Sequence, residues 1–80
     1  MRIDVRLYAT FVKYAPTQHA GDPFDVEVDD FASLTELIRK LGIPEDEVHL
    51  AIVNGLIAHD RSQFLHQGDR VALFPPVGGG

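Results

Sequence analysis

Few residues in this chain are of a kind that could carry out chemistry unaided. The chain has no cysteine, which excludes a thiolate nucleophile, a thiolate metal site and a disulfide framework within it. Ser33 has no evident general base and fits a helix cap better than a nucleophile. The four histidines are His19, His49, His59 and His66. Their separations of 30, 10 and 7 residues match no familiar ligand pattern, so we expect no metal site.

The end of the chain offers a different chemistry, that of a free carboxyl group. Pro75-Pro76 removes two amide donors and fixes two φ angles, which predicts a stiff segment at the end of a strand. Four extended residues, Val77-Gly78-Gly79-Gly80, would reach about 14 Å beyond it. Glycines have no Cβ atoms, so this thread could enter a channel that any side chain would block. The alternative is a frayed terminus, because chain ends are commonly disordered.

Two alternations of apolar and polar residues predict strands in the first third of the chain. They run over residues 2–8 and 24–29, with the period of two that half-buried strands show. The connection between them is too long for a tight hairpin. We expect one short helical turn in it, at Thr10–Ala15.

The pattern then changes to the period of a helix. Apolar residues recur at i, i+3, i+4 and i+7. These are Leu34, Leu37, Ile38 and Leu41. Ser33 and Glu36 have the spacing of a capping box, Gly42 suits the left-handed position past a helix end, and Pro44 prevents continuation.

The second half of the chain predicts three more strands. Leu50–Val53 leads into Asn54-Gly55, a dipeptide favoured where a hairpin needs two positive φ values, and residues 56–58 would return. In the polar connection that follows, Phe64 and Leu65 are expected to anchor the chain.

A turn at Gly68-Asp69 predicts a last strand at residues 70–74. If Val71 and Leu73 of this strand face the helix, Phe74 must face the other way. It would then either pack against a loop or edge side chain, or belong to an apolar docking patch. One helix across one mixed sheet buries all these apolar faces economically, which indicates an α+β fold.

Length and charge narrow the classes of function. The 80 residues suffice for one domain, and twelve acidic against seven basic residues give a formal net charge of -5. That sign argues against nucleic acid and anionic membranes as partners and favours a basic protein surface. No apolar run could span a membrane and Met1-Arg2-Ile3-Asp4 opens no signal peptide, so we expect a cytoplasmic protein.

The end of the chain resembles the signature ending of the MoaD/ThiS family of ubiquitin-like sulfur carriers. There a Gly-Asp turn leads to a strand, Pro-Pro-Val, one small residue and a terminal Gly-Gly. The matching segment reads Gly68-Asp69-Arg70-Val71-Ala72-Leu73-Phe74-Pro75-Pro76-Val77-Gly78-Gly79-Gly80. Val53-Asn54-Gly55 and the order of the elements extend the resemblance along the chain.

The resemblance implies the β-grasp (ubiquitin-like) fold, with one main helix packed on a mixed sheet of four to five strands. The first and last strands would lie adjacent and parallel at the sheet centre. Residues 1–76 would form the β-grasp domain and residues 77–80 a flexible C-terminal glycine tail.

The resemblance also implies a function closest to that of MoaD, the small subunit of molybdopterin synthase. A MoeB/ThiF-like adenylating enzyme would use ATP and Mg²⁺ to activate the carboxyl group of Gly80, and a sulfur donor would convert it to a thiocarboxylate. Gly79 and Gly78 would give the tail access to the partner's active site. The patch that contacts this enzyme and a MoaE-like large subunit would be Phe74, Pro75, Pro76 and Val77. The chain would be non-catalytic and would bind no cofactor itself.

Two other functions fit the same ending. The chain could carry sulfur to another acceptor, in thiamine, tRNA thiolation or amino-acid synthesis. It could also be a ubiquitin-like modifier, with Gly80 forming an isopeptide bond to a lysine. Pro75-Pro76-Val77 and the long first loop favour the molybdopterin route over the thiamine carriers.

Overall fold

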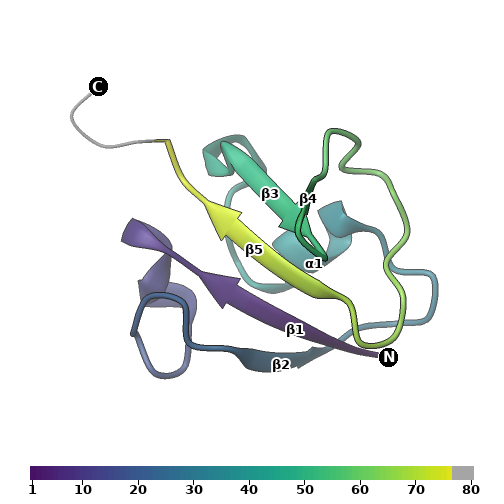
Figure 1. The fold of residues 1–80 in the computed structure, drawn as a ribbon, viewed down its shortest axis with the longest axis horizontal. Coiled ribbons are helices and arrows are strands. Elements are labelled where there is room, and N and C mark those ends of the chain that lie inside the picture. Colours follow the sequence, from purple (N-terminus) through teal and green to yellow (C-terminus); the bar gives the residue numbers. More distant parts are fainter. Residues whose placement is uncertain (77–80) are drawn as a thin grey trace.

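The computed structural model describes residues 1–76, and Val77, Gly78, Gly79 and Gly80 lie outside the described residues. It contains a five-stranded sheet and one α-helix (Figure 1). In chain order the elements are β1 (Arg2–Leu7), the 3-10 helix η1 (Ala9–Tyr14), β2 (Phe24–Glu27), α1 (Leu34–Lys40), the 3-10 helix η2 (Glu45–Glu47), β3 (Leu50–Val53), β4 (Leu56–Ile57) and β5 (Arg70–Phe74). The order of the strands and of α1 is the one predicted, and η1 lies where a helical turn was expected, but η2 was not predicted. No helix within residues 1–76 has the length and apolar character needed to cross a membrane.

The sheet is mixed, with strand order β2-β1-β5-β3-β4. β1 and β5 are parallel neighbours, with Leu7 opposite Leu73 in register, and all other pairs are antiparallel. The predicted parallel pair at the centre of the sheet is therefore confirmed, as is the β-grasp arrangement of one helix across the sheet. Because β1 and β5 run in the same direction, both end at the same side of the molecule (Figure 1).

The core lies between α1 and one face of the sheet. Its largest fully buried side chains are Ile3, Val5, Leu7, Phe11, Leu34, Leu37, Ile38, Val71 and Leu73. Alternate residues of β1 and β5 point into this layer, as the period of two requires. Each such aliphatic side chain contributes about 1.5–3 kcal/mol by leaving water.

Local signals determine where α1 begins and ends. The Glu36 amide donates to the Ser33 hydroxyl at 3.1 Å, and the Ser33 amide donates to the Glu36 carboxylate at 3.2 Å, so the predicted capping box is formed. Gly42 follows the helix with a φ of +83°, the left-handed conformation expected of it. The helix is short, so these caps and its buried face together stabilise it.

One expectation for the long connection before β5 is wrong. Leu65 is buried and anchors this segment, but the Phe64 side chain is 60% exposed and does not enter the core. The Leu65 amide donates to the Ala32 carbonyl at 2.9 Å, which turns Leu65 into the core and leaves its neighbour Phe64 pointing out.

Candidate functional site

The face of the sheet opposite α1 is apolar along one half. The alternation along β5 puts Phe74 on this outer face, and the register with β3 sets Leu50 opposite Phe74. We call the following residues the outer apolar patch: Tyr8, Leu50, Ile52, Ile57, Ala72 and Phe74. Each retains some contact with solvent, so this surface lacks a covering layer within residues 1–76.

The other half of the outer face is polar. Asp4 and Arg6 of β1 form an ion pair with 3.3 Å between Oδ1 and Nε, and Arg70 lies opposite Asp4 in register. The apolar half lies where β5 ends, because Phe74 is the last residue of β5 and Pro75-Pro76 follows it. The outer face is therefore divided, and its apolar part borders the start of the predicted tail.

Phe74 is held in place by its neighbours. Its ring stacks on Tyr8 with centroids 4.5 Å apart and planes 10° apart. Its carbonyl accepts from the His49 amide at 2.9 Å. The ring thus packs against the Tyr8 side chain and is still half-exposed in an apolar patch, and its role in docking stays a prediction.

Gly21 brings the long first loop back against Tyr8. Its amide donates to the Leu7 carbonyl at 2.9 Å, and its φ is +80°. A Cβ at this position would lie 3.2 Å from Cε1 of Tyr8 and 3.4 Å from its hydroxyl oxygen. Only glycine combines this backbone conformation with this close approach.

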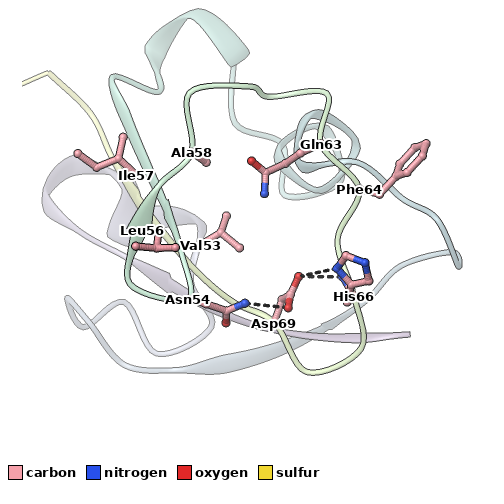
Figure 2. A pocket seen from close by; sticks show the side chains of 9 residues that line it. All are labelled: Val53, Asn54, Leu56, Ile57, Ala58, Gln63, Phe64, His66 and Asp69. Atoms are coloured by element: carbon pink, nitrogen blue, oxygen red, sulfur yellow. Dashed lines mark hydrogen bonds and ion pairs between the residues drawn. The ribbon is translucent and has the colours of Figure 1, made fainter.

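A hollow of about 320 Å³ lies between the β3–β4 hairpin and the connection to β5 (Figure 2). Three of its polar residues are joined: Asn54 donates to the Asp69 carboxylate at 2.9 Å, and that carboxylate accepts the His66 amide at 2.8 Å. These bonds connect the β3–β4 hairpin to the start of β5, so Asn54, Asp69 and His66 have a structural role in this hollow.

The remaining predicted site residues are placed as follows. Pro75 is half-buried and Pro76 is exposed at the last described position. Val77, Gly78, Gly79 and Gly80 lie outside the described residues. The four histidines are all exposed, and residues 1–76 contain no group of three side chains suited to hold a metal ion.

Sequence reasoning missed most of the outer apolar patch. Tyr8, Leu50 and Ile52 were predicted only as strand residues, although β3 is apolar at every position. Since Ala51 and Val53 face the core, Leu50 and Ile52 must face outward. A strand that is apolar at every position but has only one face toward the core is the signal that could have identified the patch.

Comparisons with known proteins agree with this fold. The family model described as "ThiS family" matches residues 6–80. SAMP1, a small archaeal modifier protein from Haloferax volcanii, is 24% identical, with a TM-score of 0.74 over 100% of both chains. A putative molybdopterin converting factor subunit 1 from Pyrococcus furiosus is 24% identical, with a TM-score of 0.71 over 96% of this chain and 99% of that one.

A third solved structure is a complex of two different subunits. It holds subunits 1 and 2 of the molybdopterin-converting factor from Helicobacter pylori 26695, and the matching chain is 24% identical, with a TM-score of 0.63 over 100% of both chains. At these identities the solved structures show a shared fold. No match was found among curated proteins.

Proposed function

The chain belongs to the ThiS family, and we propose that it is a sulfur carrier whose Gly80 carboxyl group is adenylated and then converted to a thiocarboxylate. The observation that carries the proposal is the family match over residues 6–80, because it takes in the glycine-rich ending. We further propose that the sulfur goes to molybdopterin and that the chain is the small subunit of a molybdopterin synthase. The fold shared with one chain of the Helicobacter pylori complex and with the putative subunit 1 from Pyrococcus furiosus supports this route.

The proposed reaction has two displacements, the first at the α-phosphorus of ATP and the second at the carbonyl carbon of Gly80. A carboxylate oxygen of Gly80 attacks the α-phosphorus of ATP, the bond from that phosphorus to the bridging oxygen breaks, and pyrophosphate leaves. A reduced sulfur donor then attacks the carbonyl carbon of the acyl adenylate and AMP leaves. A MoeB/ThiF-like partner supplies the catalytic groups and Mg²⁺, which offsets the phosphate charge. Under this proposal the chain supplies the reacting group, acts in the cytoplasm where ATP is available, and catalyses nothing.

The outer apolar patch has the position that such a partner needs. Ordering the tail inside an enzyme costs about 1–2 kcal/mol per residue. The surface beside the tail must offset this cost, and burial of Phe74 and its neighbours returns about 25 cal/mol per Å² of apolar area. Pro75 and Pro76 restrict φ in the segment that joins patch and tail, which lowers the entropy lost on binding. We therefore propose that Phe74, Pro75, Pro76 and Val77 bind the partner and orient the tail. Gly78 and Gly79 would let the tail enter the partner's active site.

The experiment that tests the proposal is an intact-mass measurement on untagged chain purified from its source. A chain that ends at Gly80, with one oxygen replaced by sulfur and a MoaE-like large subunit alongside, supports the proposal in full. A mature chain that continues past Gly80, or one that its adenylating enzyme does not activate with ATP, overturns it.

The same preparation tests the alternatives. A thiocarboxylate with a different companion would assign the sulfur to thiamine, tRNA thiolation or amino-acid synthesis. Adducts between Gly80 and lysine side chains would assign a modifier function, which the fold shared with SAMP1 supports. Free chain with an unmodified carboxyl group would support none of these functions.

A further inference from the structure

Two phenylalanines are exposed at the end of the sheet remote from Pro75-Pro76. Phe31 is 78% exposed and Phe64 is 60% exposed, and their rings meet edge to face with centroids 6.5 Å apart. They border a groove of about 460 Å³ whose floor includes Leu65 and whose far side includes Gln67. Figure 2 shows the Phe64 ring directed away from the hollow beside Asn54 and toward solvent. We call Phe31, Phe64 and this groove the distal aromatic surface.

The backbone at Phe31 is in a conformation that a bulky residue rarely adopts. The Ala32 amide donates to the Asp29 carbonyl at 3.1 Å and closes a turn, and Phe31, at the third position of that turn, has a φ of +68°. Glycine or asparagine is favoured at such a position. Since the Phe31 side chain is largely exposed, burial in the core does not offset this strain. Strain of this kind at an exposed aromatic residue points to a function in binding.

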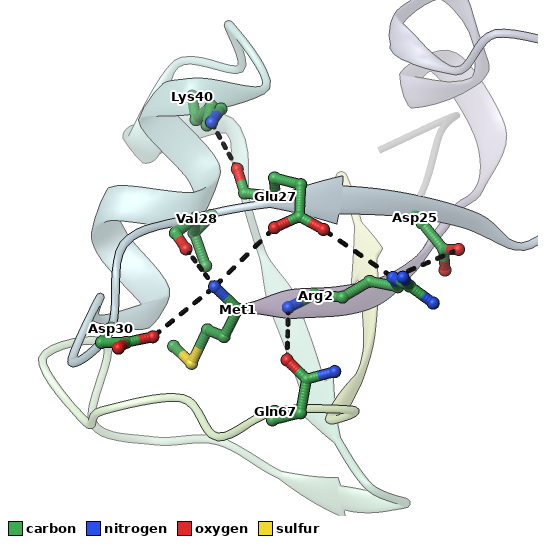
Figure 3. Close-up of polar contacts among 8 residues, drawn as sticks. All are labelled: Met1, Arg2, Asp25, Glu27, Val28, Asp30, Lys40 and Gln67. Carbon is green, nitrogen blue, oxygen red and sulfur yellow. Dashed lines mark hydrogen bonds and ion pairs between the residues drawn. The ribbon is translucent and has the colours of Figure 1, made fainter.

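The rim of the distal aromatic surface is negative. The side chains of Asp30 and Glu27 are 82% and 71% exposed. The amino group of Met1 lies 3.6 Å from Asp30 and 3.8 Å from Glu27, and the Met1 side chain beneath them is 8% exposed (Figure 3). Both carboxylates face solvent, but Glu27 is also paired with Arg2, at 3.7 Å between Oε1 and Nε, and it does not line the groove. Asp30 lines the groove, so a cation of a partner that covers Phe31 would meet Asp30.

The surface is separate from the proposed site of sulfur loading. Met1 and Gln67 precede β1 and β5, whereas Phe74 ends β5, so about 16 Å of strand lies between the two surfaces. A protein bound at one need not displace a protein bound at the other.

We propose that the distal aromatic surface docks a protein segment that presents an apolar side chain flanked by lysine or arginine. The apolar side chain enters the groove between Phe31 and Phe64, and a flanking cation meets Asp30. A second copy of this chain does not suit the surface, because its own acidic rim would face that of the first copy.

The test is a selection of random dodecapeptides displayed on phage against the full chain. Enriched peptides are synthesised, and their affinities are measured by fluorescence polarisation. We expect an apolar residue with lysine or arginine on either side, and weaker binding as salt is raised. Phe31→Gly and Phe64→Ser should each reduce the affinity by about five-fold or more. Phe74→Ala, at the other end of β5, is the matched control and should leave the affinity unchanged.

A second measurement guards against a variant that fails to fold. Phe31→Gly should raise the melting temperature, because glycine adopts a positive φ without strain. A fall in the melting temperature would give Phe31 a packing role and overturn the proposal. So would a selection that yields no peptide, peptides without basic residues, peptides indifferent to both substitutions, or self-association of the chain through Phe31.

Discussion

The ring of Tyr8 lies nearly parallel to the ring of Phe74, with 4.5 Å between their centroids. Tyr8 follows the last residue of β1 and Phe74 is the last residue of β5, so the stack joins the ends of the two central strands. The residue before Pro75 is thereby held on both its backbone and its side chain, through His49 and Tyr8. These two contacts therefore determine the direction in which the chain leaves the sheet.

The stacking of Tyr8 on Phe74 predicts that the two residues contribute to stability in a coupled way. A double-mutant cycle of Tyr8→Ala and Phe74→Ala should give an interaction free energy of about 0.5–1.5 kcal/mol in urea unfolding, because the two rings contact each other. Additive losses would show that the stack contributes nothing to stability. Phe74→Ala alone should weaken binding to the proposed large subunit by a larger factor than it lowers the folding constant, since the ring is half-exposed. A large loss of stability with unaltered affinity would instead make Phe74 a core residue.

A second prediction concerns the end of the chain. One serine added after Gly80 should abolish ATP–pyrophosphate exchange by the adenylating enzyme, because the carboxyl group is then displaced by a full residue. The melting temperature should not change, since none of the core residues of the described chain lies beyond Leu73. Exchange that survives the added residue would show that the Gly80 carboxyl group is not the group that reacts.

Gly21 and Gly42 form a matched pair for measuring the close approach to Tyr8. Both have φ near +80°, at +80° and +83°, but a Cβ on Gly42 meets nothing within 4 Å whereas one on Gly21 meets the Tyr8 ring. Gly42→Ala should cost about 1–2 kcal/mol from backbone strain alone. Gly21→Ala should cost about 1 kcal/mol more, because the added methyl group overpacks the ring. Equal losses in chemical denaturation would contradict this account of Gly21.

Elements defined by neighbouring residues could be predicted from the sequence. Ser33 and Glu36 are three positions apart, and their reciprocal bonds form within one turn of helix. Asn54-Gly55 likewise adopts the two positive φ values that the dipeptide indicated, +52° and +83°. Signals of this kind depend on backbone geometry over a few residues, and tertiary contacts did not override them.

The family resemblance supplied the pairing of β1 with β5, but individual side-chain contacts between distant residues could not be predicted. Nothing local to Tyr8 indicates that it meets Phe74, 66 positions along the chain, or that Gly21 closes against it. The prediction that Phe64 anchors the connection together with Leu65 failed for a related reason. In a segment without regular structure, two adjacent apolar residues do not reveal which one faces the core, and the bond from Leu65 to Ala32 decides it.

The pKa of Asp60 provides a test of the turn that precedes Leu65. Hydrogen bonds from the hydroxyl and the amide of Ser62 lower the pKa of the Asp60 carboxyl group, because both favour the ionised form. The contribution to stability is therefore present above the ordinary pKa of about 3.9 and is lost as the pH falls through the folded-state pKa. Ser62→Ala should raise the Asp60 pKa in a carboxyl NMR titration, since the amide bond alone remains. An unchanged pKa would show that the hydroxyl does not contribute.

Asn54 is expected to be the residue that most strongly fixes the start of β5. Its backbone amide donates to the Arg70 carbonyl at 2.8 Å. Its side-chain oxygen accepts the backbone amide of Arg70 at 2.9 Å, and its side-chain nitrogen donates to the Asp69 carboxylate at 2.9 Å. Asn54→Gly keeps the positive φ and loses only the side-chain bonds, so it should cost about 1 kcal/mol. Asn54→Ala also strains the backbone and should cost about 2–3 kcal/mol.

Chemical denaturation of the two Asn54 variants, with hydrogen exchange at the Arg70 amide, checks this account. Exchange at Arg70 should quicken in both variants, because both leave that amide without its side-chain acceptor. If glycine and alanine prove equally destabilising, the positive φ of Asn54 contributes no strain. If Arg70 exchanges as slowly as in the parent chain, the side-chain bond is not what protects it, and the position of β5 must be fixed by its neighbours in the sheet.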